Sequence, residues 1–137
     1  MIDLCDYSLQ KLRDDGELII SRGRRADDGA SILLLSAVSE HPSPASIDRI
    51  KHAYSLRDEL DSSWPIRPLE PLNPHSIPSL LLDDRDGDFL DEVLRRSPSL
   101  EELLRLASAI TRALGGLHAR ALKEIQRHVT LTSEREP

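Results

Sequence analysis

Two short, continuous apolar runs constrain the fold of this chain more than any other feature of its sequence. They are Ile32 to Leu35 and Leu80 to Leu82, and turn-forming or polar residues bound both of them. Runs of this length need burial and are typical of strands in the interior of a sheet. The sequence therefore predicts strands over Ala30 to Val38 and over Ile77 to Leu82.

A further strand is predicted just before the first of these runs. Glu17 to Ser21 follows the turn signal of Asp14, Asp15 and Gly16. The stretch from Arg22 to Gly29 is polar and contains two glycines, so we expect it to form the turn of an antiparallel hairpin. Residues 66–69 are extended by their prolines and add another strand if they pair with residues 77–82.

Three helices are predicted from apolar spacing and from capping residues. Ser43 or Ser46 caps the first helix, which ends near residues 61–63. A short helix covers Phe89 to Arg95, and the longest helix opens at Ser97 to Ser99. One wide apolar face runs along this longest helix. It consists of Leu100, Leu103, Leu104, Ala107, Ile110, Leu114 and Leu117.

The order of these elements indicates the α+β class: an antiparallel sheet with one helix packed on it, followed by a short and a long helix. We expect three segments along the chain. Residues 1–82 form the α+β region, residues 83–122 form an acidic connection and the two later helices, and residues 123–137 form a polar, partly disordered tail.

Composition excludes several functional classes. The chain has 137 residues, with 18 basic and 24 acidic side chains, so its net charge is −6. A nucleic-acid-binding protein is normally basic, so we expect no nucleic-acid partner. No apolar run approaches the ~20 residues of a membrane span, so we expect no association with a membrane. Cys5 is the single cysteine, which excludes an internal disulfide. The first residues lack the basic region of a secretory signal, and we expect a cytoplasmic location.

The order of elements and several stretches of sequence resemble a known family. The chain is similar to the amino-terminal serine/threonine protein kinase-like domain of large bacterial signalling proteins that also carry an ATPase module and a sensor histidine kinase. The resemblance spans about residues 14–120. It rests on Val38 to Ser46, His52 to Leu60, Trp64 to Leu69, Leu80 to Leu90 and Leu103 to Arg120.

The resemblance implies a kinase amino-terminal lobe, its hinge, and the first helices of the carboxy-terminal lobe, with the chain truncated there. It also implies ATP and magnesium as cofactors. Gly23 and Gly29 would lie in the phosphate-binding loop, and Leu82, Asp83 and Asp84 would border the adenine cleft.

The residues that perform kinase chemistry are missing from the corresponding positions. The strand from Ile32 to Val38 contains no lysine, and Ala53 stands where the family has its helix glutamate. Ala121 to Val129 does not match the catalytic loop, and no magnesium-binding motif follows it. We therefore identify no catalytic residue and expect no phosphotransfer by this chain alone, with at most vestigial ATP binding.

No other group of residues in the sequence predicts a catalytic or metal-binding site. Asp84, Asp86 and Asp88 alternate, but the glycine and the glutamate that an EF-hand loop needs for calcium binding are not at the required positions, so we expect no metal site.

The alternative function is that of a protein-interaction or regulatory module. In that hypothesis the helix over residues 99–117 binds a protein partner or a second copy of the chain through its apolar face. The contacting residues would be Leu103, Leu104, Ala107, Ile110 and Leu114.

Overall fold

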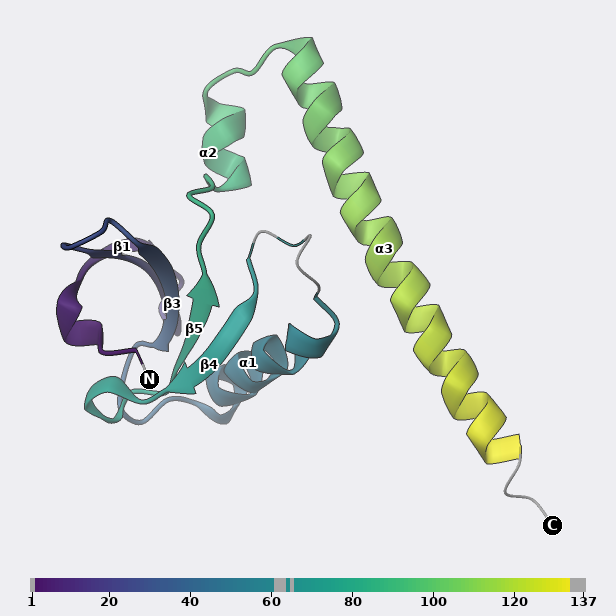
Figure 1. The fold of residues 1–137 in the computed structure, drawn as a ribbon, viewed down its shortest axis with the longest axis horizontal. Helices are drawn as coiled ribbons and strands as arrows, with labels where there is room; N and C mark the ends of the chain where they lie inside the picture. Colours follow the sequence, from purple (N-terminus) through teal and green to yellow (C-terminus); the bar gives the residue numbers. More distant parts are fainter. Residues whose placement is uncertain (1, 61–63, 65, 134–137) are drawn as a thin grey trace. The chain divides into compact units, whose positions relative to one another are not determined.

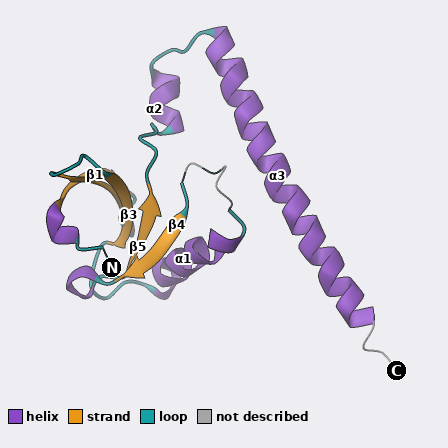
Figure 2. Ribbon diagram, viewed as in Figure 1, coloured by secondary structure: helices purple, strands orange, loops and turns teal. Residues whose placement is uncertain are grey.

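The computed structural model describes residues 2–60, 64 and 66–133, and for residues 122 and 124–133 it describes the backbone alone. The chain divides into two units, residues 1–87 and residues 88–137. The first unit contains an antiparallel sheet with a helix, and the second contains two further helices (Figures 1 and 2). The predicted α+β class is confirmed.

The sheet of the first unit has five antiparallel strands in the order β1-β2-β3-β5-β4. β3 and β5 therefore lie in its interior, while β1 and β4 form its edges. Two prolines lie in β4, in keeping with an edge position, because proline has no amide hydrogen for a ladder. The bounds are β1 Tyr7–Asp14, β2 Leu18–Arg25, β3 Ser31–Ala37, β4 Pro68–Leu72 and β5 Ser79–Asp83.

Both faces of the central strands are covered, which explains why their apolar runs are continuous. On one face, a buried cluster joins the sheet to the helix α1 (Pro44–Ser55). This cluster consists of Leu18, Ala37, Ile50 and Leu80. On the opposite face, Ile32, Leu34 and Leu81 are buried. Ile2, Leu4, Tyr7 and Leu72 pack against this second cluster, so the amino-terminal segment helps to cover the sheet.

The predicted hairpin is correct in its two strands but wrong in its turn. β2 continues through Arg25, so Arg22 to Arg25, predicted to be turn residues, lie in a strand. The turn is formed by the shorter stretch from Ala26 to Gly29. β1 was not predicted, because most of its side chains are exposed and its sequence therefore lacks a strong apolar pattern.

The first helix begins where the sequence predicts and ends earlier. The side chain of Ser43 accepts a hydrogen bond from the amide of Ser46, which makes Ser43 the cap. The α-helix stops at Ser55, whose hydroxyl donates to the carbonyl of His52, and the 3-10 turn Leu56–Asp58 follows. The predicted end at residues 61–63 lies outside the described residues. Two more 3-10 turns occur at Leu4–Asp6 and Pro74–Ser76.

The second unit contains α2 (Leu90–Arg95) and α3 (Leu100–Ser133). Ser99 and Glu102 form a capping box at the start of α3: each side chain accepts a hydrogen bond from the other residue's amide. The backbone of α3 extends past Leu122, where the sequence becomes polar, and residues 134–137 lie outside the described residues. Within the described residues, no helix is long and apolar enough to cross a membrane.

Replacing the most buried core leucine should destabilise the first unit strongly. Leu80 is 0% exposed and packs between the sheet and α1, so Leu80→Ala should lower the free energy of unfolding by about 3 kcal/mol. Urea denaturation followed by the fluorescence of Trp64 measures this loss, because Trp64 belongs to the same unit. Leu69→Ala is the matched control, since Leu69 is 41% exposed and should cost less than about 1 kcal/mol. Equal losses would contradict the assignment of the core.

Candidate functional site

Most of the residues that the resemblance assigns to nucleotide binding lie at one end of the sheet. Gly23 on β2 pairs with Ile32 on β3, and Ile32 pairs in turn with Asp83 on β5. Leu82 and Asp84 flank Asp83 in sequence, so they belong to the same end of β5. Gly29 lies in the adjoining turn between β2 and β3. The strand pairing thus brings together residues about sixty positions apart in the sequence.

The two glycines serve the packing and the turn of this hairpin. A Cβ atom on Gly23 would lie 2.9 Å from Cγ1 of Ile32 and 3.1 Å from Cδ2 of Leu9, so the close approach of these side chains requires glycine. Gly29 has a φ of +69°, a conformation that side-chain-bearing residues rarely adopt. Its amide donates to the carbonyl of Arg25 and helps to close the turn.

Asp84 is the most fully buried charged group at this end of the sheet. Its side chain is 1% exposed and pairs with Arg22, whose side chain is 16% exposed. The guanidinium Nε lies 2.7 Å from Oδ2 of Asp84, and the Nη2 atom lies 3.3 Å from Oδ1. The Ser31 hydroxyl also donates to Oδ2, and the amide of Asp86 donates to Oδ1 at 2.9 Å. Both carboxylate oxygens are therefore already hydrogen-bonded within the protein.

The same arginine also fixes the segment that follows β5. Nη2 of Arg22 donates to the carbonyl of Gly87 at 2.9 Å, and Arg24 pairs with Asp86 at 2.7 Å.

Burial by itself would raise the pKa of Asp84. The hydrogen bonds from Ser31, Arg22 and Asp86 outweigh burial, so the pKa of Asp84 is lowered from its ordinary 3.8.

The alternating aspartates thus pair with arginines. Arg22 binds Asp84, Arg24 binds Asp86, and Arg96 binds Asp88 at 2.8 Å. Among the described residues, no group of three or more acidic, histidine or cysteine side chains is placed to hold a metal ion.

An additional hairpin turn precedes the stretch that the resemblance assigns to phosphate binding. Because β1 precedes β2, the first turn is Asp15 to Glu17, and the stretch Arg22 to Gly29 belongs to the second hairpin. Phosphate groups bind well to free backbone amides in a glycine-containing turn. Here the turn's own carboxylates occupy those amides. Asp14 accepts from the amide of Gly16 at 2.9 Å, and Asp15 accepts from the amides of Glu17 and Leu18 at 3.0 and 2.7 Å.

The acidic turn is also bound to the helix α1. The amides of Leu18 and Glu17, and then the guanidinium of Arg49, lower the pKa of Asp15 to about 2. Arg49 lies 2.9 Å from Asp15 and 3.7 Å from Glu17, and the Ser46 hydroxyl donates to Glu17 at 3.3 Å. These contacts join the start of α1 to the first hairpin.

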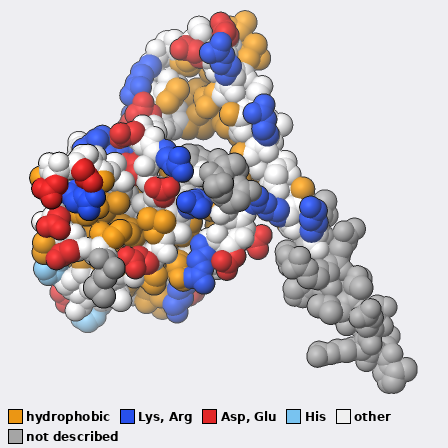
Figure 3. All heavy atoms as spheres, in the orientation of Figure 1, with side chains coloured by type: hydrophobic (Ala, Val, Ile, Leu, Met, Phe, Trp, Pro, Cys, Tyr) orange, Lys and Arg blue, Asp and Glu red, His pale blue; other side chains and the backbone are white. Residues whose placement is uncertain are grey.

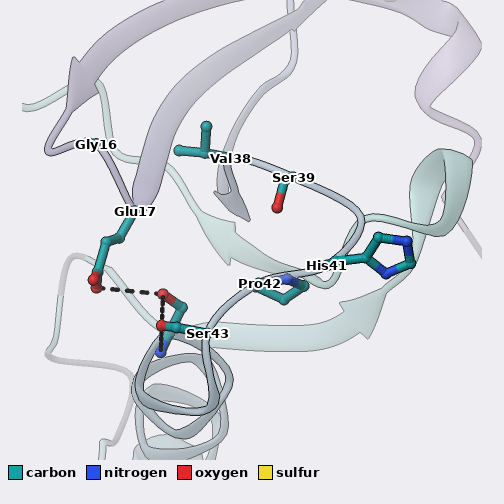
Figure 4. Close-up of a pocket in the computed structure, with 8 residues that line it drawn as sticks. Gly16, Glu17, Val38, Ser39, His41, Pro42 and Ser43 are labelled. Carbon is teal, nitrogen blue, oxygen red and sulfur yellow. Dashed lines mark hydrogen bonds between the residues drawn. The ribbon is translucent and has the colours of Figure 1, made fainter.

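A small surface pocket lies between this turn and the start of α1 (Figure 4). Its volume is about 160 Å³, which is below the roughly 300–1,000 Å³ typical of pockets for small organic ligands. Glu17 and Ser43 line one side, and His41 lies at the opposite end in Figure 4. Ser46 is 2% exposed and is already paired with Ser43 and Glu17. The polar groups here stabilise the helix start.

The contact between β3 and α1 is apolar at the place where the resemblance leads us to expect an ion pair. Leu35 of β3 and Ala53 and Tyr54 of α1 pack against the same buried cluster. Ala53 is the position where the resemblance expects glutamate, and Leu35 is the residue of central β3 that shares this cluster. An apolar contact of this kind cannot position a phosphate group.

Comparison with protein-family models and with curated proteins gives no match for this chain.

Sequence reasoning missed the groups that organise the end of the sheet. The sequence pattern placed Arg22 in a solvent-exposed turn, and Ser31 carried no signal at all. Their common partner, Asp84, is 62 residues from Arg22 and 53 from Ser31, so only the strand order reveals the contact. Similarly, the alternation of apolar residues on α1 gave no indication that Arg49 binds Asp15.

Neutralising Asp84 should destabilise the first unit much more than neutralising its neighbour. Asp84→Asn leaves the largely buried Arg22 without its counter-charge, so we expect a loss of about 2–4 kcal/mol in the free energy of unfolding. Asp86→Asn is the matched control. The pair of Asp86 and Arg24 is more than half exposed, and it should cost less than about 1 kcal/mol.

The effect of Asp84→Asn should also depend on pH. The pKa of Asp84 is lower in the folded chain than in the unfolded chain, so its carboxylate stabilises the fold above its ordinary pKa. That contribution disappears as the pH falls through the folded-state pKa. Urea denaturation at neutral pH and below about pH 4 should therefore show the difference from wild type shrinking in acid. A difference that is constant with pH would contradict a charged Asp84.

Proposed function

We propose that this chain is a kinase-like amino-terminal lobe, followed by the first helices of a second lobe, that does not transfer phosphate by itself. The observation that carries the proposal is the order of its elements. Three antiparallel strands, one packed helix, two further strands, an acidic glycine-containing connection and two helices follow one another along the chain. The sequence resemblance implies a β-hairpin, one helix, two strands, an acidic turn and two helices, and the observed order has one additional strand, β1, before that hairpin. This order supports a pseudokinase of the serine/threonine type in a signalling protein.

The residues at the corresponding chemical positions support loss of activity. β3 contains no lysine, and Leu35 and Ala53 are apolar at the junction with α1. The amides of the first turn are already bound to Asp14 and Asp15. Three acids in this short turn, with Glu17 the third, would also repel a triphosphate. We therefore propose that the chain binds ATP and magnesium weakly at most. The cytoplasmic location stays a prediction.

A thermal melt with nucleotide tests the proposed loss of function. A ligand that binds only the folded state raises the melting temperature once its concentration exceeds its dissociation constant. We expect millimolar ATP with magnesium to raise the melting temperature by less than about 1 °C. Sodium sulfate at the same ionic strength serves as the control for salt effects. A saturable rise of several degrees with nucleotide alone would show a functional cleft and contradict the proposal.

A double-mutant cycle tests the kinase-like geometry separately. Leu35→Lys and Ala53→Glu should each destabilise the fold, because each places a charge at the half-buried junction of β3 and α1. If these positions correspond to the kinase ion pair, the double variant should recover about 1 kcal/mol relative to the sum of the single losses.

Ala45→Glu provides the matched control for this cycle, because Ala45 is exposed in the first turn of α1. Combined with Leu35→Lys, it should give no coupling in the free energy of unfolding. The same coupling in both pairs would show that Leu35 does not face Ala53, and would remove the structural basis for the comparison with a kinase.

A second function, protein interaction through α3, is favoured by the exposure of that helix. Leu100 is 73% exposed and Leu104 is 60% exposed, and Leu103, Ile110 and Leu114 are also exposed. Apolar side chains gather on the surface of the helical unit (Figure 3). A hollow of about 540 Å³ between α2 and α3 is lined by Val93, Pro98 and Leu106 together with Arg96, Ser97, Glu102 and Arg105. Exposed apolar surface of this extent marks an interaction site. We propose that a protein partner or a second copy of the chain binds α3.

A further inference from the structure

The apolar face of α3 has the spacing of a coiled-coil seam. From Leu100 to Leu117, apolar residues recur at alternating intervals of three and four, which is the a and d pattern of a heptad repeat. The a positions are Leu100, Ala107 and Leu114, and the d positions are Leu103, Ile110 and Leu117. The seam contains no charged or polar side chain, and Leu104 and Leu106 flank it at the e and g positions.

We do not expect α3 to be stable as an isolated helix. Gly115 and Gly116 both weaken it, because glycine gains conformational freedom in the unfolded chain. Helices in proteins gain most of their stability from packing of an apolar face rather than from intrinsic propensity. Five of the large apolar residues on the face of α3 are exposed, so the face requires a partner of matching shape.

We infer that the partner is a second copy of this chain, paired with α3 in the antiparallel direction. The inference rests on the interaction role proposed for α3 and names its occupant. In the register that centres the seam between Ser108 and Ala109, each a position faces a d position of the other copy. The resulting layers are Leu100 with Leu117, Leu103 with Leu114, and Ala107 with Ile110.

The sizes of the seam residues favour this direction. A parallel pair would place Ala107 against Ala107 and leave a void, and then crowd Ile110 against Ile110. The antiparallel pair puts the small alanine opposite the large isoleucine, so every layer is filled. Parallel two-stranded coiled coils also prefer β-branched residues at a, whereas this seam has leucine or alanine at a and its one β-branched residue, Ile110, at d.

The helix dipoles favour the same direction. An antiparallel pair sets the two dipoles in opposition, whereas a parallel pair aligns them. The charged side chains do not decide the direction, because Glu101, Glu102, Arg105 and Arg112 lie at b, c or f positions outside the seam.

The length of the seam determines the expected affinity of the dimer. The seam has three a and three d positions and is slightly shorter than three full heptads, which is short for a coiled coil, and stable interfaces bury roughly 800 Å² on each partner. Leu104 and Leu106 widen the seam toward that area. We therefore expect reversible dimers with a dissociation constant on the order of micromolar.

Sedimentation equilibrium of the full chain tests the inference. We expect a concentration-dependent change from the mass of one chain to twice that mass. Ile110→Glu should raise the dimer dissociation constant at least about tenfold, because it buries a charge at a d position. Ser108→Glu, which adds the same side chain at a b position outside the seam, should leave it unchanged. Circular dichroism of both variants checks that the helix content is kept.

Spin labels on cysteine variants determine the direction of pairing. Glu101 and Ser108 occupy the same heptad position, so a parallel pair gives both labels the same distance between copies. In the antiparallel register, labels at 108 lie at nearly the same height, while labels at 101 are separated by about 22 Å along the axis. Cys5→Ser supplies the background free of the native thiol.

Several outcomes would overturn the inference. The inference would be wrong if the chain stayed monomeric at submillimolar concentration or formed a larger assembly. It would also be wrong if Ile110→Glu left the dimer dissociation constant unchanged, or if both spin labels gave equal distances. A monomer would still leave the kinase-like proposal intact, since that proposal is tested by nucleotide and by the double-mutant cycle. It would also leave a different protein as the occupant of α3.

Discussion

Burial of the two central strands on both faces is the constraint on which the first unit depends. β3 and β5 lie between α1 on one side and the amino-terminal residues on the other. This arrangement places the ends of β2, β3 and β5 together, and it is the reason that Arg22, Ser31 and Asp84 meet. The carboxylate of Asp84 can be buried there because its partners are in place, since burial of an unpaired charge costs free energy.

The polar groups at both ends of the sheet are occupied by the protein itself. Asp84 holds the segment after β5 against β2, and Asp14 and Asp15 close the first turn by accepting from its amides. Arg49 then links that turn to α1. In a phosphate-binding lobe, such amides and cations would face a ligand. Here they stabilise local structure, and this difference is the physical basis for proposing a kinase-like scaffold without phosphotransfer.

The sequence was informative where a local pattern decides the structure. The apolar runs predicted β3 and β5, Ser43 and Pro44 predicted the start of α1, and the spacing from Leu100 predicted α3. It failed where the structure depends on distant partners. Arg22 to Arg25 looked like part of a turn because the stretch up to Gly29 is polar and contains two glycines, yet pairing with β1 and β3 keeps these residues extended. β1 has little apolar character of its own, and a strand at the edge needs only one neighbour. The partners of Asp84 could not be predicted at all.

Backbone amide shifts during a nucleotide titration decide whether the first turn can bind phosphate. Asp14 and Asp15 already bind the amides of this turn. In ¹⁵N-correlated spectra, the amides of Gly16, Glu17 and Leu18 should show no saturable change as ATP with magnesium is raised to millimolar concentration. Saturable shifts confined to these amides would show that the turn accepts phosphate, and would contradict the account.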